Sequence, residues 1–201
     1  MNPGFYHLPE EKQNNIINAG FRIFSQNTYK KAPVAEIAAE AGISKALLFY
    51  HFKNKKEIYL FLWNTSIELT RKEILEQNVF GTNDFFELMG RSLKVKCNLM
   101  KRYPYVSQFS LRAYYEPELE IRQEIQSNFD EISAESERII FSSIDLNKLR
   151  DDIDLHEMYL EMIWAADGYL HFALLKGTVD ADIIEKEFEK LLKIWKKVYE
   201  K

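Results

Sequence analysis

The chain has 201 residues, which is enough to bury a core without disulfides or structural metals. Its one cysteine, Cys97, excludes an internal disulfide and favours a reducing compartment. The first residues lack the basic and apolar regions of a signal peptide, and the apolar runs are far too short to span a bilayer. We therefore expect a cytoplasmic protein without membrane contacts.

The net charge of -4 argues weakly against nucleic-acid binding, but the charged residues are unevenly distributed along the chain. Residues 1–60 contain eight Lys or Arg and five Asp or Glu, so this segment carries a positive surplus. The remaining residues are acidic. A basic N-terminal segment is what a DNA-facing module requires, and the acidic remainder must have another role.

Helical periodicity runs through nearly the whole chain, and no segment has a convincing strand pattern. The first helix is expected to begin near Pro9, because proline suits a first helical turn and the acids that follow favour the positive end of the helix dipole. Asn54-Lys-Lys-Glu57 resembles a capping box that opens a long helix. The pattern predicts an all-α protein in which three short N-terminal helices precede six longer ones. After the first helix, the predicted ranges are about 33–40, 44–51, 54–78, 84–102, 104–114, 117–143, 155–176 and 181–200.

The second and third predicted helices form a helix-turn-helix. Ala38 lies where two helices must approach closely, and Gly42 occupies a turn position that favours a positive φ. Ser44 can cap the next helix through its hydroxyl. This unit places its second helix in the DNA major groove.

The sequence here resembles the TetR-type (tetracycline-repressor) family of regulators. The resemblance covers about residues 16–62, and the run Leu48-Phe-Tyr-His-Phe-Lys-Asn-Lys55 is very close to the family signature. It implies an all-α homodimer in which residues 1–53 bind DNA. Residues 54–201 would bind a small effector and dimerise through the last two helices.

The chain departs from the family pattern at several positions. Thr28 replaces a usual glycine, so Asn27 is expected to take the left-handed turn instead. Ala32-Pro33 replaces a threonine pair that caps the second helix and touches phosphate. Leu47 and Phe49 replace residues with hydroxyl groups. These changes alter individual DNA contacts rather than the docking mode.

The candidate DNA contacts lie around the predicted recognition helix. Lys45 can either hydrogen-bond a guanine base or contact only phosphate, and both interpretations stay open. Leu47, facing away from the buried Leu48, can contact a thymine methyl group. His51 is assigned to the DNA backbone, with a purely structural capping role as the alternative. Lys55 and the free N–H groups near it suit phosphate. The expected DNA-binding set is Pro33, Val34, Ser44, Lys45, Ala46, Leu47, Phe49, Tyr50, His51 and Lys55.

The effector-binding residues are less clearly marked, because any one of them is better explained as core. As a group, the aromatic and Met side chains of the longer helices can surround an apolar cavity. Asp167 interrupts an apolar stretch, where it can meet a cation or hydroxyl of a ligand, pair across a dimer interface, or pair with an arginine. The expected set is Trp63, Met89, Leu93, Cys97, Met100, Phe109, Phe129, Trp164, Asp167 and His171.

An enzyme is not expected, and neither a cofactor nor a metal is. None of the four histidines has the glutamate three residues earlier that di-iron helical bundles use, and no glycine-rich phosphate loop is present. We expect a one-component transcriptional regulator, a repressor that binds a palindromic double-stranded DNA operator as a homodimer and is released by a small, largely apolar effector. An activator is one alternative, and a helical scaffold or partner-binding protein without effector response is another.

Overall fold

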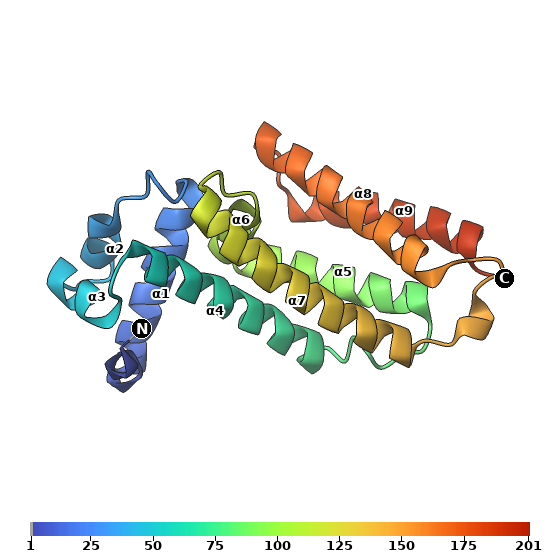
Figure 1. Cartoon of the computed structure of the whole chain (residues 1–201), viewed down its shortest axis with the longest axis horizontal. Coiled ribbons are helices and arrows are strands. Elements are labelled where there is room, and N and C mark those ends of the chain that lie inside the picture. The colour runs from blue at the N-terminus through green and yellow to red at the C-terminus, as the bar shows by residue number, and fades with distance from the viewer. Residues whose placement is uncertain (1) are drawn as a thin grey trace. The chain divides into compact units, whose positions relative to one another are not determined.

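The computed structural model describes residues 2–201, which form nine α-helices, two short 3-10 helices and one isolated β-bridge between Leu149 and Glu200 (Figure 1). The predicted all-α class is therefore confirmed. The elements are η1 (Pro3–His7), α1 (Glu10–Gln26), α2 (Val34–Glu40), α3 (Lys45–His51), α4 (Lys55–Glu76), α5 (Phe85–Arg102), α6 (Pro104–Tyr114), α7 (Leu119–Ser143), η2 (Leu146–Lys148), α8 (Leu155–Lys176) and α9 (Ala181–Tyr199).

The chain folds into two compact units. The first contains the chain up to residue 69 together with residues 103–129, and the second contains residues 70–102 and 130–201. Helices α4 and α7 contribute to both. These two units are defined by how the chain packs. The division expected after residue 53 separates DNA binding from effector binding and dimerisation, and it stays a prediction.

Local sequence signals produce the helix-turn-helix as expected. Gly42 adopts a φ of 68°, in the left-handed region, and ends the turn after α2. The Ser44 hydroxyl accepts the Leu47 N–H at 3.1 Å and caps α3. At the start of α4, Asn54 Oδ1 accepts the Glu57 N–H at 2.9 Å, while Glu57 accepts the Lys53 N–H at 2.6 Å. Side-chain caps therefore fix the N-terminal ends of α3 and α4.

An aromatic cluster forms the core of the first unit. The Tyr59 ring of α4 lies 4.9 Å from both Phe24 of α1 and Phe109 of α6, measured between ring centroids. Gly20 allows α1 to approach α4 closely, since a Cβ there would come within 2.7 Å of the Leu62 side chain. Helix α1 is thus packed directly onto α4 and α6.

The second unit is organised around α5, α8 and α9. Ile184 and Phe188 of α9 pack with Cys97 of α5 in a buried cluster. α8 and α9 run side by side (Figure 1), joined where Trp195 Nε1 donates to Glu161 at 3.2 Å and where the Tyr169 and Phe188 rings meet edge to face. Asp154 and Asp180 cap the N-termini of α8 and α9.

Two features differ from the sequence-based expectation. Asn27 is extended, with a φ of -131°, so the prediction that it takes a left-handed turn is wrong. The chain leaves α1 through an extended residue instead, and the Asn27 side chain donates to the Ile23 carbonyl at 2.9 Å. The 3-10 helix η1 was not predicted, because a five-residue turn has too few residues to show periodicity.

Candidate nucleic-acid interface

The N-terminal end of α3 presents a polar, accessible face. Ser44, Lys45 and Ala46 are exposed, and Tyr50 is 65% exposed one and a half turns further along. The Lys45 ammonium lies 5.8 Å from the centre of the Phe49 ring, which holds the charge over the helix surface. This arrangement is the one that a helix entering a DNA groove requires, because the first residues of such a helix reach the base edges.

Leu47 and Phe49 are half-buried, while Leu48 between them is fully buried. At the start of α2, Pro33 and Val34 are also half-buried, and Val34 packs against the core of the first unit. These residues offer apolar surface rather than charge.

His51 is placed differently from the other candidate DNA contacts. Its side chain is 3% exposed, and neither ring nitrogen has a hydrogen-bond partner within residues 2–201. The ring lies against Phe5 of η1 and Tyr50, and burial lowers the pKa of His51. A side chain held this way helps to position α3 against η1 and has little surface left for contact with another molecule.

Lys55 is engaged within the protein. Its Nζ donates to the Ala32 carbonyl at 2.6 Å and to the Lys30 carbonyl at 3.2 Å, and it lies 5.2 Å from the centre of the Tyr29 ring. Desolvation lowers the pKa of Lys55. The ammonium therefore fixes the loop before α2, and phosphate could reach it only beside these carbonyls.

A buried carboxylate, which the sequence analysis missed, supports the same loop. Glu116, between α6 and α7, is 1% exposed, and its Oε2 accepts the Tyr29 N–H at 2.9 Å and the Tyr59 hydroxyl at 3.5 Å. Burial and the nearby carboxylate raise the pKa of Tyr59. The sequence analysis did not single out Glu116, because Tyr29 and Tyr59 lie far from it along the chain.

The expected effector residues fall in three different environments. Trp63, Phe109 and Phe129 belong to the core of the first unit, where Trp63 Nε1 donates to Asn128 at 2.8 Å. On α5, Met89 is half-buried, whereas Leu93, Cys97 and Met100 pack into the cluster with α9. On α8, Trp164 and His171 are exposed and Asp167 is half-buried. The ten residues are thus divided between the first unit and two helices, α5 and α8, of the second unit.

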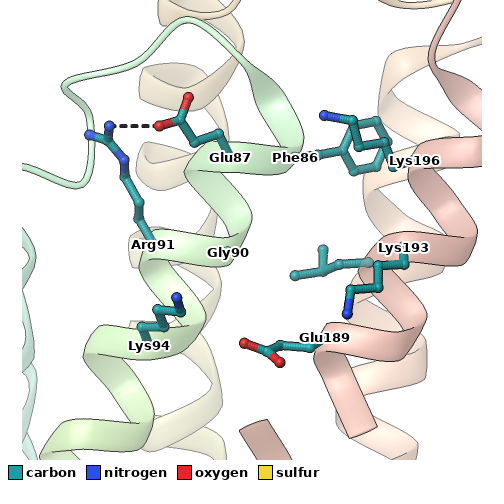
Figure 2. Close-up of a pocket in the computed structure, with 9 residues that line it drawn as sticks. Phe86, Glu87, Gly90, Arg91, Lys94, Glu189, Lys193 and Lys196 are labelled. Atoms are coloured by element: carbon teal, nitrogen blue, oxygen red, sulfur yellow. Dashed lines mark hydrogen bonds and ion pairs between the residues drawn. The ribbon is translucent and has the colours of Figure 1, made fainter. Parts of the chain in front are cut away.

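A groove of about 470 Å³ lies between α5 and α9 in the second unit (Figure 2). Phe86 and Leu192 contribute to its lining, but most of the lining residues are charged, including Lys94, Glu189 and Lys193. Small-molecule sites are mostly apolar with few polar groups. The groove does not have that composition, so the effector is not assigned to it.

Among residues 2–201, no group of three or more His, Cys, Asp or Glu side chains is placed to hold a metal ion. None of the helices formed by these residues is long and apolar enough to cross a membrane.

The chain is similar to bacterial regulators over its N-terminal part. Residues 16–61 match the model of a family described as bacterial regulatory proteins, tetR family. The HTH-type transcriptional regulator AcrR of Shigella flexneri is 30% identical over 57 residues, which are 28% of this chain and 26% of that protein. The fatty acid metabolism regulator protein of Bacillus subtilis is 29% identical over 104 residues, 51% of this chain and 46% of that protein. The chain therefore matches about a quarter to a half of the length of these relatives.

Solved structures resemble the whole fold. A TetR family transcriptional regulator from Chloroflexus aurantiacus aligns with 100% of this chain and 98% of its own, with a TM-score of 0.64 and 22% identity. The fatty acid degradation regulator FadR from Bacillus halodurans aligns with 89% of this chain and 96% of its own, with a TM-score of 0.71 and 14% identity. At such identities, these structures establish the fold alone.

Proposed function

We propose that the protein is a one-component transcriptional regulator of the TetR family, which represses by binding a palindromic operator as a homodimer. The match of residues 16–61 to the model of bacterial regulatory proteins of the tetR family supports this proposal. The observation that carries the proposal is the capped helix α3, whose N-terminal residues are exposed while its other side packs into the core. A helix held this way can enter a major groove without unfolding its support.

In this proposal the contacts divide by chemistry. Lys45 reaches bases or phosphate, Leu47 offers an apolar edge to a thymine methyl, and Tyr50 hydrogen-bonds the backbone. The remaining members of the set lie beside them and shape the surface. They are Pro33, Val34, Ser44, Ala46, Phe49 and Lys55, with His51 acting through the position of α3.

The proposed dimer interface is the outer surface of α8 and α9. Trp164, Phe172 and Leu175 of α8 are 64%, 65% and 71% exposed, and they share one helix face with Gly168. On α9, the apolar residues Ile183, Ile194 and Val198 are also exposed. Large apolar patches of this kind mark interaction sites in folded proteins. A dimer brings two recognition helices to two half-sites of one operator.

We propose that a small, largely apolar effector releases the protein from DNA. The Met and aromatic side chains of the longer helices support this, and two similar proteins are named regulators of fatty acid metabolism or degradation. Release requires that the effector prefer the conformation that does not fit the operator, since equal affinity for both conformations shifts nothing.

Selection of bound genomic fragments tests the proposal. We expect an enriched inverted repeat, with an affinity whose logarithm falls linearly with the logarithm of salt concentration. Lys45→Ala should weaken binding. A loss confined to one G·C pair indicates base reading, whereas a uniform loss with a slope reduced by about one indicates phosphate contact. Lys12→Ala, an equal change of charge on the exposed part of α1, is the control. The absence of any enriched inverted repeat would contradict the proposed regulator function.

A further inference from the structure

The groove between α5 and α9 is lined by two regular rows of side chains, both within the second unit. Phe86, Gly90 and Lys94 follow one another at four-residue spacing along α5, so they share one face of that helix. The lining residues of α9, at the three- and four-residue spacings of one helix face, are Glu189, Leu192, Lys193 and Lys196. Figure 2 shows Lys94 on one side of the groove and Glu189 and Lys193 on the other.

Gly90 keeps the groove open. A Cβ placed on this glycine would meet no atom within 4 Å, so no contact in the described part of the chain requires the side chain to be absent. Glycine is disfavoured inside a helix, yet this one lies one turn from Phe86 and one turn from Lys94. Phe86 and the half-buried Leu192 supply apolar surface beside the space. The groove therefore has room for a ligand against a small apolar area.

The charge of the groove is opposite to that of the chain around it. Residues 61–201 contain nineteen Lys or Arg and twenty-six Asp or Glu, yet the groove lining carries a surplus of two positive charges. The charged lining residues are Arg91, Lys94, Lys193, Lys196, Glu87 and Glu189. A basic hollow in an acidic region attracts small anions, because neighbouring charges of one sign raise the local concentration of counter-ions.

Two of these four cations are paired inside the chain, and two are not. Arg91 lies 2.7 Å from Glu87, and the Lys196 ammonium lies 3.2 Å from a carboxylate oxygen of Glu200. Lys94 and Lys193 form neither a hydrogen bond nor an ion pair with any other residue of the range 2–201. One unpaired ammonium group thus comes from each of the two helices.

The other end of the same helix pair shows the contrast. There, the Lys101 ammonium of α5 lies 2.7 Å from Asp182 and 3.0 Å from Glu185, both on α9. At that end a cation of one helix meets carboxylates of the other, whereas along the groove Lys94 and Lys193 lie on opposite sides without such a match. A bound anion would complete the charge pairing between α5 and α9.

We propose that this groove binds a small organic dianion, whose negative charges lie between Lys94 and Lys193 and whose body covers Gly90 and Phe86. Phosphate monoesters and dicarboxylates share this chemistry. The half-buried carboxylate of Glu189 disfavours further negative charge and can accept a hydrogen bond from a ligand hydroxyl. The ligand is distinct from the apolar effector, and its site does not depend on DNA binding.

Aromatic compounds of similar shape and different charge test the site. At pH 8, phenyl phosphate carries two negative charges and phenyl sulfate carries one, whereas phenol is uncharged. Each is titrated against the full-length protein by isothermal calorimetry at low salt, where charge interactions are least screened. We expect one phenyl phosphate per chain, bound about fivefold tighter than phenyl sulfate, and phenol bound most weakly. Phthalate, a dicarboxylate on one ring, distinguishes a site for both kinds of dianion from a site for phosphate esters alone.

Variants separate the groove from general attraction to surface lysines. Lys193→Gln and Lys94→Gln should each remove the preference for phenyl phosphate, whereas Lys186→Gln, at an exposed lysine of α9 outside the lining, should retain it. Gly90→Leu keeps every charge but fills the groove, so it should abolish binding while circular dichroism shows an unchanged helical content.

Three outcomes would overturn the site: equal affinities for phenyl phosphate and phenyl sulfate, the same loss in Lys186→Gln as in Lys193→Gln, or undiminished binding to Gly90→Leu. The last would mean that the anion meets exposed lysines only. Operator binding enters none of these measurements, so their failure leaves the regulator function untouched.

Discussion

The Glu116 carboxylate reaches from the segment between α6 and α7 to the loop before α2. Besides the Tyr29 N–H, it accepts the Glu118 N–H at 3.3 Å, so one buried side chain satisfies backbone donors from two distant segments. Lys55 holds the same loop through two carbonyls. The loop before α2 is therefore held by single polar contacts as well as by apolar packing.

Removing Glu116 should loosen this loop. Glu116→Ala leaves the Tyr29 N–H without its acceptor in a buried place, and we expect the free energy of unfolding to fall by about 1–3 kcal/mol. Operator affinity should fall with it, equally for all sequences, because the loop positions the helices without reading bases. Urea denaturation and DNA titration measure the two effects. Glu116→Gln keeps an acceptor and should lose less. Equal losses for both variants would show that the hydrogen bond is not the cause.

His51 makes stability depend on pH. Burial lowers the pKa of His51 in the folded state, so the unfolded chain binds the proton more readily. The free energy of unfolding should therefore fall as the pH drops below about 6.5, the ordinary histidine pKa. His51→Phe removes the titrating group and should flatten this part of the profile. The difference between the two profiles, measured by denaturation from pH 8 to 5, isolates His51 from other groups. Parallel profiles would contradict this account.

The element η1 shows how a short segment supports the recognition helix. Phe5 is fully buried, and its ring lies 5.3 Å from that of Phe52 and 5.2 Å from that of Phe61. The Asn2 N–H donates to the His51 carbonyl at 2.8 Å, which satisfies a group at the C-terminal end of α3. Helix α3 thus has a serine cap at one end and a 3-10 helix packed at the other.

Phe5→Ala should cost about 3–5 kcal/mol in unfolding free energy, because it removes a fully buried ring and leaves a cavity. Tyr6→Ala, next in sequence and 61% exposed, is the matched control and should change stability by only a few tenths. Chemical denaturation monitors both variants. If Phe5→Ala is as stable as Tyr6→Ala, η1 does not support α3.

For the molecule as a whole, the main open feature is the outer surface of α8, whose large apolar side chains are exposed in the single chain. A Cβ placed on Gly168 would meet no atom within 4 Å, so no contact inside the chain requires a glycine there. Gly168 lies between Trp164 and Phe172 at helical spacing on the exposed face. A small residue at that point suits the close approach of a helix from a second copy.

Gly168→Glu should therefore convert a dimer into monomers and abolish operator binding, without loss of helical structure. Gly90→Glu is the matched control, since Gly90 lies within α5 and has equal room for a Cβ. Sedimentation velocity distinguishes the two variants. We expect the wild type and Gly90→Glu to sediment as dimers. A monomeric wild type, or a dimeric Gly168→Glu, would remove α8 from the interface.

The helical class and the helix-turn-helix were both predictable from residues that are close together in the sequence. Periodicity placed most of the helices within a few residues of their ends, and Gly42, Ser44 and Asn54 act through chain neighbours, so their roles were predictable.

Only the tertiary structure decided which side chains meet across large distances in the chain. Glu116 and Tyr29 are 87 residues apart, and Phe5 packs against residues of α4, so neither contact has a local signal. In the structure, His51 is buried and the Lys55 ammonium donates to backbone carbonyls. The sequence around α3, taken alone, suggests that both side chains are free polar groups. Helix geometry follows from neighbours in sequence, whereas burial and charge compensation depend on every segment that packs around a residue.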